Sequence, residues 1–211
     1  MLFFIRHGET PANRQKRYLG KTDEPLSPEG RAALLAYRKD CPPADFLFTS
    51  PMLRCRQSAA LLYPSLSGRV IRQWEEIDFG DFEGKNYREL ADSAAYQAWI
   101  DSGGTLLFPG GESREAFIGR CREGLLCCLQ MLGSKAPGQN LPEKRISAAL
   151  IVHGGTVMAL LSSYGGGSYF DYGCKNGDGY QCLAEFCTDA RGNVREDTLR
   201  FTGVEALWAI T

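Results

Sequence analysis

The sequence predicts an α/β fold with three layers, α/β/α, built around a mostly parallel, twisted sheet. Short apolar segments of strand length alternate with longer segments of helical pattern along the 211 residues, and this alternation is typical of a parallel sheet covered by helices. With 44% hydrophobic and 23% charged residues, the composition is that of a globular protein. No shift in composition divides the chain, so we expect residues 1–211 to form a single domain.

The first part of the chain predicts three strands and two helices. The run "LFFIR" at 2–6 is short and continuously apolar, as in a buried strand. A helix is expected over about 28–40, because Ser27 suits the N-cap and Pro28 suits the first helical position. The strand "DFLFTS", a second helix with the same Ser-Pro start ("SPMLRCRQSAALLY") and the strand "GRVIRQ" follow.

The middle of the chain has helical character without a clear strand. Residues 86–101 read as helical, and "GTLLFPGGES" then interrupts the pattern. We therefore expect residues 85–115 to form an inserted helical lid. A long helix is predicted from about 112 to 133, and the polar stretch 133–145 is the best candidate for an exposed loop.

The remaining segments complete the predicted sheet. "ISAALIVHGG" indicates another buried strand, and "TVMALLSSYG" indicates the helix after it. "GYQCLAEFC" and "REDTLRFTG" predict a final antiparallel pair joined by the turn "DARGN".

Charge and cysteine usage exclude several classes of function. The net charge of −1 favours neither nucleic acid nor an anionic membrane as a partner, and the apolar runs are too short to cross a bilayer. The start "MLFFIRHG" lacks the basic region of a signal peptide. The eight cysteines contain no C-x-x-C pair, so we expect free thiols in a reducing, cytoplasmic protein.

The two histidines are the first candidates for chemistry. His7 and His153 are the only histidines, and each directly follows a predicted buried strand and precedes glycine. Ligands of open α/β sheets lie outside the carboxyl ends of the strands. We therefore expect the two imidazoles to meet in one crevice, whereas the alternative for each is a buried structural histidine.

Two arginines and an acidic segment extend the candidate site. Arg6 precedes His7, and Arg54 lies in the first turns of a predicted helix, whose amino end favours an anion. Guanidinium groups bind two phosphate oxygens at once, so these residues predict a phosphate site, although Arg54 alone would suit a surface ion pair. One carboxylate of "EEIDFGDFEG" is expected to donate a proton; spacing does not distinguish Glu75, Glu76, Asp78, Asp81 and Glu83.

Six motifs in order give the sequence a family resemblance. "IRHGET", "DEPLSPEGR", "TSPMLRCRQSA", "EEIDFGDFEG", "PGGES" and "LIVHGGT" resemble the histidine phosphatase superfamily, the phosphoglycerate-mutase-like group with an "RHG" motif. The resemblance runs from residue 2 to about residue 160. It implies a phosphoglycerate-mutase-like fold and the transfer of a phosphoryl group through a phosphohistidine.

The resemblance also implies a role for each candidate residue. The catalytic residues would be His7 as the nucleophile, Glu76 as the proton donor and His153 beside the phosphate. The phosphate-binding residues would be Arg6, Asn13, Arg54 and Thr156. The chemistry needs no metal or other cofactor, and the arginines would repel a dication from a metal site on the two histidines.

Several functional alternatives stay open. The segment between Gly84 and "PGGES" is short, which favours a phosphatase over a phosphoglycerate-type mutase. The length of the chain and the segment "EIDFGDFEG" resemble the branch that contains α-ribazole phosphatases and small broad-range phosphatases. The expected substrate is therefore a small-molecule phosphomonoester. A non-catalytic phosphate sensor or phosphoprotein-binding module is the alternative from another class, and a homodimer remains open.

Two further features concern specificity. Five basic residues fall between positions 6 and 21 against one acid, Glu9; they predict either a basic rim that attracts polyanions or a solvated loop. The five are Arg6, Arg14, Lys16, Arg17 and Lys21. Trp99 and Phe108 in the expected lid either stack on an aromatic substrate or form the core of the lid.

Overall fold

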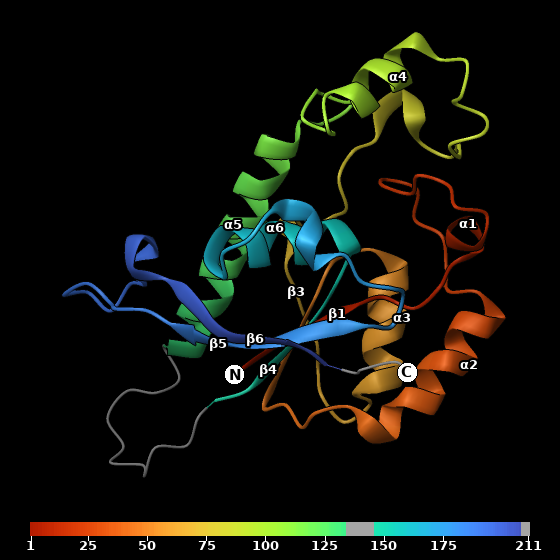
Figure 1. Ribbon diagram of the computed structural model, residues 1–211. Helices are drawn as coiled ribbons and strands as arrows, with labels where there is room; N and C mark the ends of the chain where they lie inside the picture. The colour runs from red at the N-terminus through yellow and green to blue at the C-terminus, as the bar shows by residue number, and fades with distance from the viewer. Residues whose placement is uncertain (134–145, 208–211) are drawn as a thin grey trace.

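A six-stranded mixed sheet forms the centre of the protein. The structure is a computed structural model that describes residues 1–133 and 146–207 (Figure 1). The strand order is β3-β2-β4-β1-β5-β6, in which β1 to β4 are parallel and β5 runs antiparallel to β1 and β6. The strands are β1 (Leu2–Arg6), β2 (Phe46–Thr49), β3 (Arg69–Val70), β4 (Ala148–Val152), β5 (Gly179–Glu185) and β6 (Arg200–Ala206).

Six α-helices are described around this sheet. They are α1 (Pro11–Arg14), α2 (Pro28–Tyr37), α3 (Leu53–Leu62), α4 (Ala94–Asp101), α5 (Arg114–Gly133) and α6 (Gly154–Tyr164). The start of α2 is as predicted: the hydroxyl of Ser27 accepts the N–H of Gly30 at 2.9 Å, and Pro28 follows it. No helix among the described residues is both long and apolar enough to cross a membrane.

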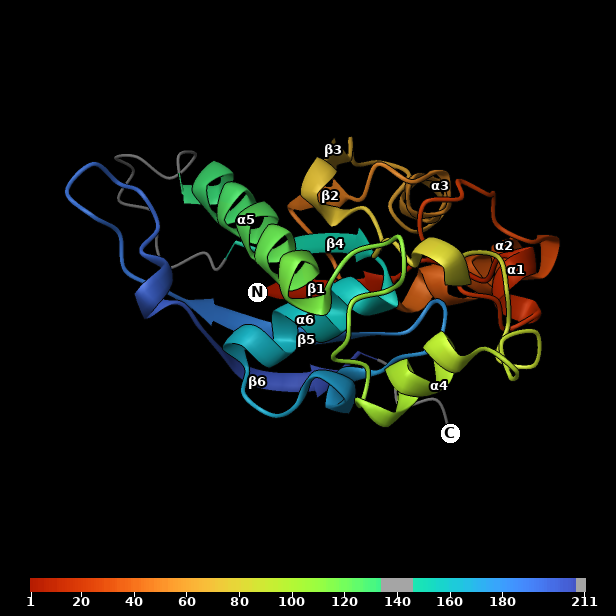
Figure 2. The ribbon, with the colours of Figure 1, turned by 90° about the horizontal axis from the view of Figure 1, so that it is seen from above.

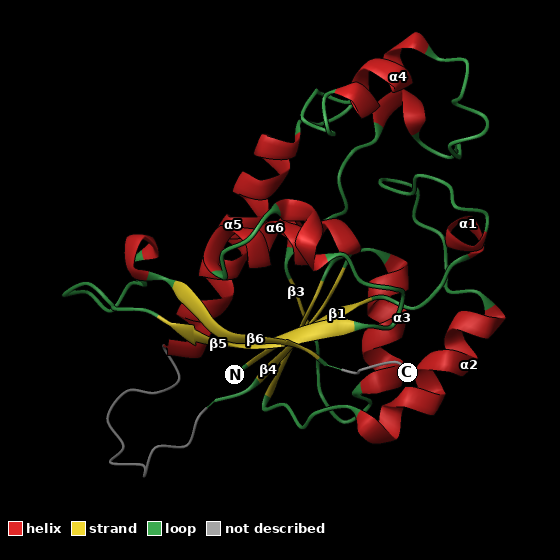
Figure 3. Cartoon of the chain, in the orientation of Figure 1, coloured by secondary structure: helices red, strands yellow, loops and turns green. Residues whose placement is uncertain are grey.

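Alternation along the strands separates the core into two halves. Ile5, Leu47 and Ile151 belong to a cluster with side chains of α2 and α3. Their neighbours Phe4 and Phe48 belong to a second cluster, with side chains of α5 and α6. Because successive strand residues point to opposite faces, helices cover both faces of the sheet (Figure 3). The predicted α/β/α arrangement around a mostly parallel sheet is confirmed.

Some elements differ in extent from the sequence prediction. The helix expected over 28–40 ends at Tyr37 and continues as a 3₁₀ turn to Asp40. The strand expected in "GRVIRQ" is limited to Arg69–Val70. The last strand begins at Arg200, because residues 196–198 form a 3₁₀ turn. Residues 134–145 of the predicted polar loop lie outside the described residues.

The helix expected over 86–101 is shorter than predicted. Only α4 is helical, and residues 86–93 form turns. The side-chain oxygen of Asn86 accepts the N–H groups of Arg88 and Glu89 and so caps a single turn, and Ser93 then caps α4 as a separate start. In Figures 1 and 2, α4 lies beyond the carboxyl ends of β1 and β4, whereas α5 and α6 lie over the sheet.

Candidate active site

The two histidines meet because their strands are neighbours. β1 and β4 pair in parallel with Arg6 opposite Val152, and the N–H of His7 donates to the Val152 carbonyl at 2.9 Å. His7 and His153 therefore directly follow the ends of two neighbouring strands. Their ring centroids lie 5.2 Å apart, and both side chains are buried. The two imidazoles thus meet at this edge of the sheet, as the sequence predicted.

His7 is held as a neutral imidazole with one free ring nitrogen. Its Nδ1 lies 2.7 Å from the carbonyl oxygen of Gly8. A carbonyl only accepts, so this contact requires the proton on Nδ1 and leaves the lone pair on Nε2. Burial, followed by the charges of Arg54 and Arg6, holds the pKa of His7 well below 6.5. The ring is thus prepared to act as a nucleophile.

Gly8 allows this arrangement by its small size. A Cβ at this position would meet the Leu34 side chain at 2.7 Å. The N–H of Gly8 donates to the hydroxyl of Ser58 at 3.0 Å, which fixes the carbonyl that orients His7. The histidine is therefore positioned through the backbone of the next residue.

His153 is oriented by its two ring nitrogens. Nε2 lies 2.8 Å from the hydroxyl of Ser50, and Nδ1 accepts the Nε–H of Arg54 at 3.3 Å. Because guanidinium only donates, the proton of the neutral ring lies on Nε2. Burial and the same two arginine charges that act on His7 hold the pKa of His153 well below 6.5.

Arg54 is a fully buried cation at the amino end of α3. Besides His153, its guanidinium donates to backbone carbonyls of the loop after α1, those of Thr22 at 2.9 Å and Gly20 at 3.0 Å. No carboxylate among the described residues pairs with Arg54. Its positive charge is therefore not cancelled by an ion pair and can attract an anion into the crevice.

Arg6 and Asn13 lie on the other side of His7. Arg6 donates to the Cys174 carbonyl at 2.7 Å, while its Nε is buried without a partner among the described residues. Asn13 accepts the side-chain N–H of Asn176 at 3.0 Å, and Asn176 also donates to the His7 carbonyl at 3.2 Å. Asn176 thus connects Asn13 with the backbone of His7.

Glu76 is the carboxylate that the fold brings to this site. One oxygen accepts the N–H of Ile77 at 3.0 Å and lies so near Gly155, at the start of α6, that a Cβ there would approach it to 2.5 Å. Burial raises the pKa of Glu76, and the charges of Arg54 and Arg6 oppose this only in part. A carboxyl group with a raised pKa suits proton donation.

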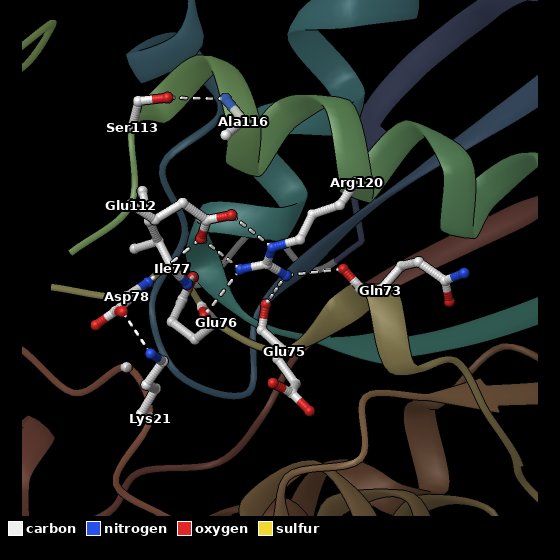
Figure 4. A network of polar contacts seen from close by, with 12 residues as sticks. Lys21, Gln73, Glu75, Glu76, Ile77, Asp78, Glu112, Ser113, Ala116 and Arg120 are labelled. Atoms are coloured by element: carbon white, nitrogen blue, oxygen red, sulfur yellow. Dashed lines mark hydrogen bonds and ion pairs between the residues drawn. The ribbon is translucent and has the colours of Figure 1, made fainter. Parts of the chain in front are cut away.

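Arg120 of α5 holds the segment that carries Glu76 (Figure 4). Two of its N–H groups bind the Glu112 carboxylate, both at 2.7 Å. The other three donate to the carbonyls of Gln73, Glu75 and Glu76 at 2.6 to 3.1 Å. All five guanidinium N–H groups are therefore used, and the acidic segment is fixed against α5.

Thr156 lies in the first turn of α6 and is fully buried. The hydroxyl is next to the thiol of Cys121, on α5. The structure therefore places Thr156 between α5 and α6, while the other four candidates, Arg6, Asn13, Arg54 and Glu76, lie near His7 and His153.

Four positioning residues were missed from the sequence. Ser50, Ser58, Asn176 and Arg120 act through contacts with residues far away in the chain. Ser50, the last residue of a predicted strand, and Ser58 lie within the motif "TSPMLRCRQSA", which was a signal for both. Asn176 and Arg120 stand outside the quoted motifs.

A cleft of about 840 Å³ opens beside Arg6, Gly8 and Asn13. Most of the basic residues predicted as a rim are neutralised. Arg14 pairs with Glu9 and Glu29, Arg17 with Glu89, and Lys21 with Asp78. Of the five basic residues, only Lys16 and the half-buried Arg6 have no ion pair among the described residues and could attract a polyanion.

The donor set does not suit a metal ion. Among residues 1–133 and 146–207, no three His, Cys, Asp or Glu side chains are grouped to hold one. The eight cysteines are free thiols, and Cys55 lies 3.5 Å from His153 Nε2 with burial raising its pKa to about 12. The arrangement of two neutral imidazoles, two guanidinium groups and a carboxyl group can instead bind a phosphate and transfer a proton.

Comparisons with known proteins show which family the sequence matches. Residues 2–177 match the histidine phosphatase superfamily (branch 1). The crystal structure of phosphoglycerate mutase from Thermus thermophilus is similar with a TM-score of 0.63 and 30% identity, covering 92% of this chain and 95% of that chain.

Two relatives illustrate the similarity in sequence. "Uncharacterized phosphatase PhoE" of Bacillus subtilis is 29% identical over 168 residues, which is 77% of this chain and 76% of that protein. An adenosylcobalamin/alpha-ribazole phosphatase of Salmonella typhimurium is 32% identical over 128 residues. That match spans 56% of this chain and 62% of the relative, less than two thirds of its length.

Proposed function

Because the chain belongs to the histidine phosphatase superfamily (branch 1), we propose that it hydrolyses a phosphomonoester through a phosphohistidine on His7, without a metal. The observation that supports this most is the state of His7. Its Nδ1 proton is committed to the Gly8 carbonyl, so a free Nε2 lone pair lies beside His153 and within the field of two arginines.

In the first step, Nε2 of His7 attacks phosphorus and the bond from phosphorus to the ester oxygen breaks. Negative charge is spread over the three equatorial oxygens, and Arg6, Arg54 and Asn13 stabilise it. The carboxyl group of Glu76 donates its proton to the departing oxygen, which leaves as an alcohol. Its raised pKa keeps this proton available.

In the second step, water attacks the phosphohistidine. The Glu76 carboxylate accepts a proton from that water, the bond from phosphorus to nitrogen breaks, and inorganic phosphate leaves. His7 returns to the neutral imidazole. The buried His153, held by Ser50 and Arg54, keeps the phosphate oriented in both steps.

The proposed substrate is a small-molecule phosphomonoester. The name of the Salmonella relative makes α-ribazole phosphate one candidate. A phosphoglycerate-type mutase is the second candidate function, and the similarity to the Thermus structure favours it. In a mutase, the phosphoryl group returns to a sugar acid instead of passing to water.

The test is hydrolysis of p-nitrophenyl phosphate with and without a chelator, followed by detection of phosphohistidine after alkaline quenching. We expect turnover that the chelator leaves unchanged, and a loss of about 10³-fold or more in His7→Asn. Loss with chelator would indicate a metal site, and phosphate binding without turnover would indicate a binding module. Recovery of the phosphoryl group on 3-phosphoglycerate would indicate a mutase.

A further inference from the structure

We propose that this site takes phosphate esters whose alcohol carries a flat apolar ring, and that an aromatic pocket beside Glu76 holds this ring. The inference rests on the proposed function. In an in-line displacement, the departing oxygen lies opposite the attacking nitrogen and next to the proton donor. The carbon skeleton of the substrate must therefore occupy a cavity that adjoins Glu76.

Two described cavities adjoin Glu76, and one of them has a net negative wall. The polar cavity, about 510 Å³, contains four carboxylates against the cations Lys21 and Arg120. Lys21 lies 2.5 Å from Asp78, and Arg120 is fully engaged. A net negative wall disfavours a second anion or a sugar acid. The large cleft beside Arg6 is not lined by Glu76.

The second cavity is a pocket of about 220 Å³ with aromatic walls. Its aromatic side chains come from five separate segments of the chain and are Tyr18, Phe79, Trp99, Phe108, Tyr169 and Phe170. We call it the aromatic pocket. Its volume is below the roughly 300–1,000 Å³ of sites for drug-sized ligands, so it suits one ring system.

Several aromatic side chains of the pocket pack against one another. Trp99 and Phe108 pack with ring centroids 5.0 Å apart, and Phe79 and Phe108 pack edge to face at 5.1 Å. Phe108 is buried, whereas Phe170 stays 57% exposed at the rim. Such an exposed aromatic beside a buried cluster offers apolar area that a ligand ring can cover.

Two of the residues that line the aromatic pocket, Trp99 and Arg114, also carry polar groups. The indole N–H of Trp99 is buried and unpaired among the described residues. Arg114 lies over the rings of Tyr169 and Phe170, at 5.3 and 5.7 Å, and pairs with no described carboxylate. Arg114 also donates to the Gly103 carbonyl at 3.4 Å, so it is a held cation beside the aromatic wall, and such a cation favours the face of a further aromatic ring.

The experiment compares 2-(2-naphthyl)ethyl phosphate with ethyl phosphate. Both esters release a primary alcohol of similar basicity, so the ratio of their kcat/KM values reports the ring and not the chemistry. We expect the naphthyl ester to be preferred by about tenfold or more. Phe170→Ala and Trp99→Ala should lower this ratio toward one.

Leu35→Ala is the matched control, because Leu35 is 51% exposed on α2 and lies outside the pocket. It should leave the ratio unchanged. Phe170 is exposed, so its variant tests the inference even if Trp99→Ala lowers stability. Turnover of both esters with a ratio near one, or a ratio that Phe170→Ala leaves unchanged, would overturn the inference. Absence of turnover with either ester would overturn the phosphatase proposal itself.

Discussion

Gly155, at the start of α6, is the residue on which the position of Glu76 depends most directly. A Cβ at this position would approach a Glu76 oxygen to 2.5 Å and the Phe117 ring to 3.1 Å. Gly155→Ala should therefore displace the carboxyl group. We expect kcat/KM for alkyl phosphates to fall by about 10–100-fold, with a smaller loss for p-nitrophenyl phosphate, whose departing oxygen needs no proton.

Gly119→Ala on α5 is the control for this substitution. No atom lies within 4 Å of a Cβ built there, and alanine is favoured over glycine inside a helix by about 0.5–1 kcal/mol. The control should keep its activity and become slightly more stable. Equal losses with both substrates in Gly155→Ala would mean that the glycine affects something other than the proton donor.

The candidate residues at strand ends could be predicted from the sequence, whereas the residues that position them could not. His7 and His153 could be found because a polar residue after a buried strand is a local pattern. Glu76 was one of five acids, and only the resemblance selected it. Asn176 could not be found, because its contacts with Asn13 and the His7 carbonyl join residues 163 and 169 positions apart.

At the scale of elements, α5 and the segment 73–76 act as one unit through Arg120. Arg120→Lys would replace five directed N–H groups with a single ammonium group that cannot reach three carbonyls and a carboxylate together. We expect about a tenfold loss of kcat for alkyl phosphates, with p-nitrophenyl phosphate less affected. The free energy of unfolding should fall by about 1–3 kcal/mol for a carbonyl left unpaired.

Arg122→Lys, two residues further along α5, provides the comparison. Arg122 pairs with Glu196 and donates to the hydroxyl of Tyr164, remote from the acidic segment. Loss of kcat in Arg122→Lys equal to that in Arg120→Lys would contradict a specific role of Arg120. Steady-state kinetics with both esters and urea unfolding supply the measurements.

Elements with a strong period or a cap were predictable, and weakly patterned ones were not. The predicted start of α2 is confirmed, because Ser27 and Pro28 form a cap that needs no tertiary contact. The prediction for residues 86–93 was wrong, because Asn86 caps only one turn and the helix begins again at the cap Ser93. The four-residue α1 was not predicted, since it is too short to show a period.

At the scale of the whole molecule, two buried neutral histidines make stability depend on pH. Below 6.5 the unfolded chain binds protons that the folded histidines, with lowered pKa values, do not bind. The free energy of unfolding should therefore fall on acidification by at most about 1.4 kcal/mol per pH unit for each histidine. The raised pKa of Glu76 acts in the opposite direction and offsets part of this fall.

Urea unfolding between pH 5 and 7.5 measures this slope, and the double variant His7→Asn/His153→Asn is the control. It removes both histidines of the chain, so its stability should vary less across this range. Carboxylates with lowered pKa, such as Asp78, lose their contribution only at lower pH. A slope that is the same in the double variant would show that other groups cause it.

The fold class was predictable at this scale because alternation of strands and helices is a property of the full sequence. The strand order was not, because it depends on which β-strands pair across long separations. Neither local pattern nor composition places β1 between β4 and β5. The aromatic pocket, assembled from five segments, has no sequence pattern for the same reason.

The central place of β1 has a consequence for biosynthesis. Leu2 pairs with Ala148 on one side and with Cys182 on the other, so this strand leaves the ribosome long before either neighbour is made. Contacts of such long range slow folding. During translation the segment "LFFIR" has no partner strand and exposes apolar side chains that chaperones can bind. We expect the proposed phosphatase activity only after synthesis of the chain is nearly complete.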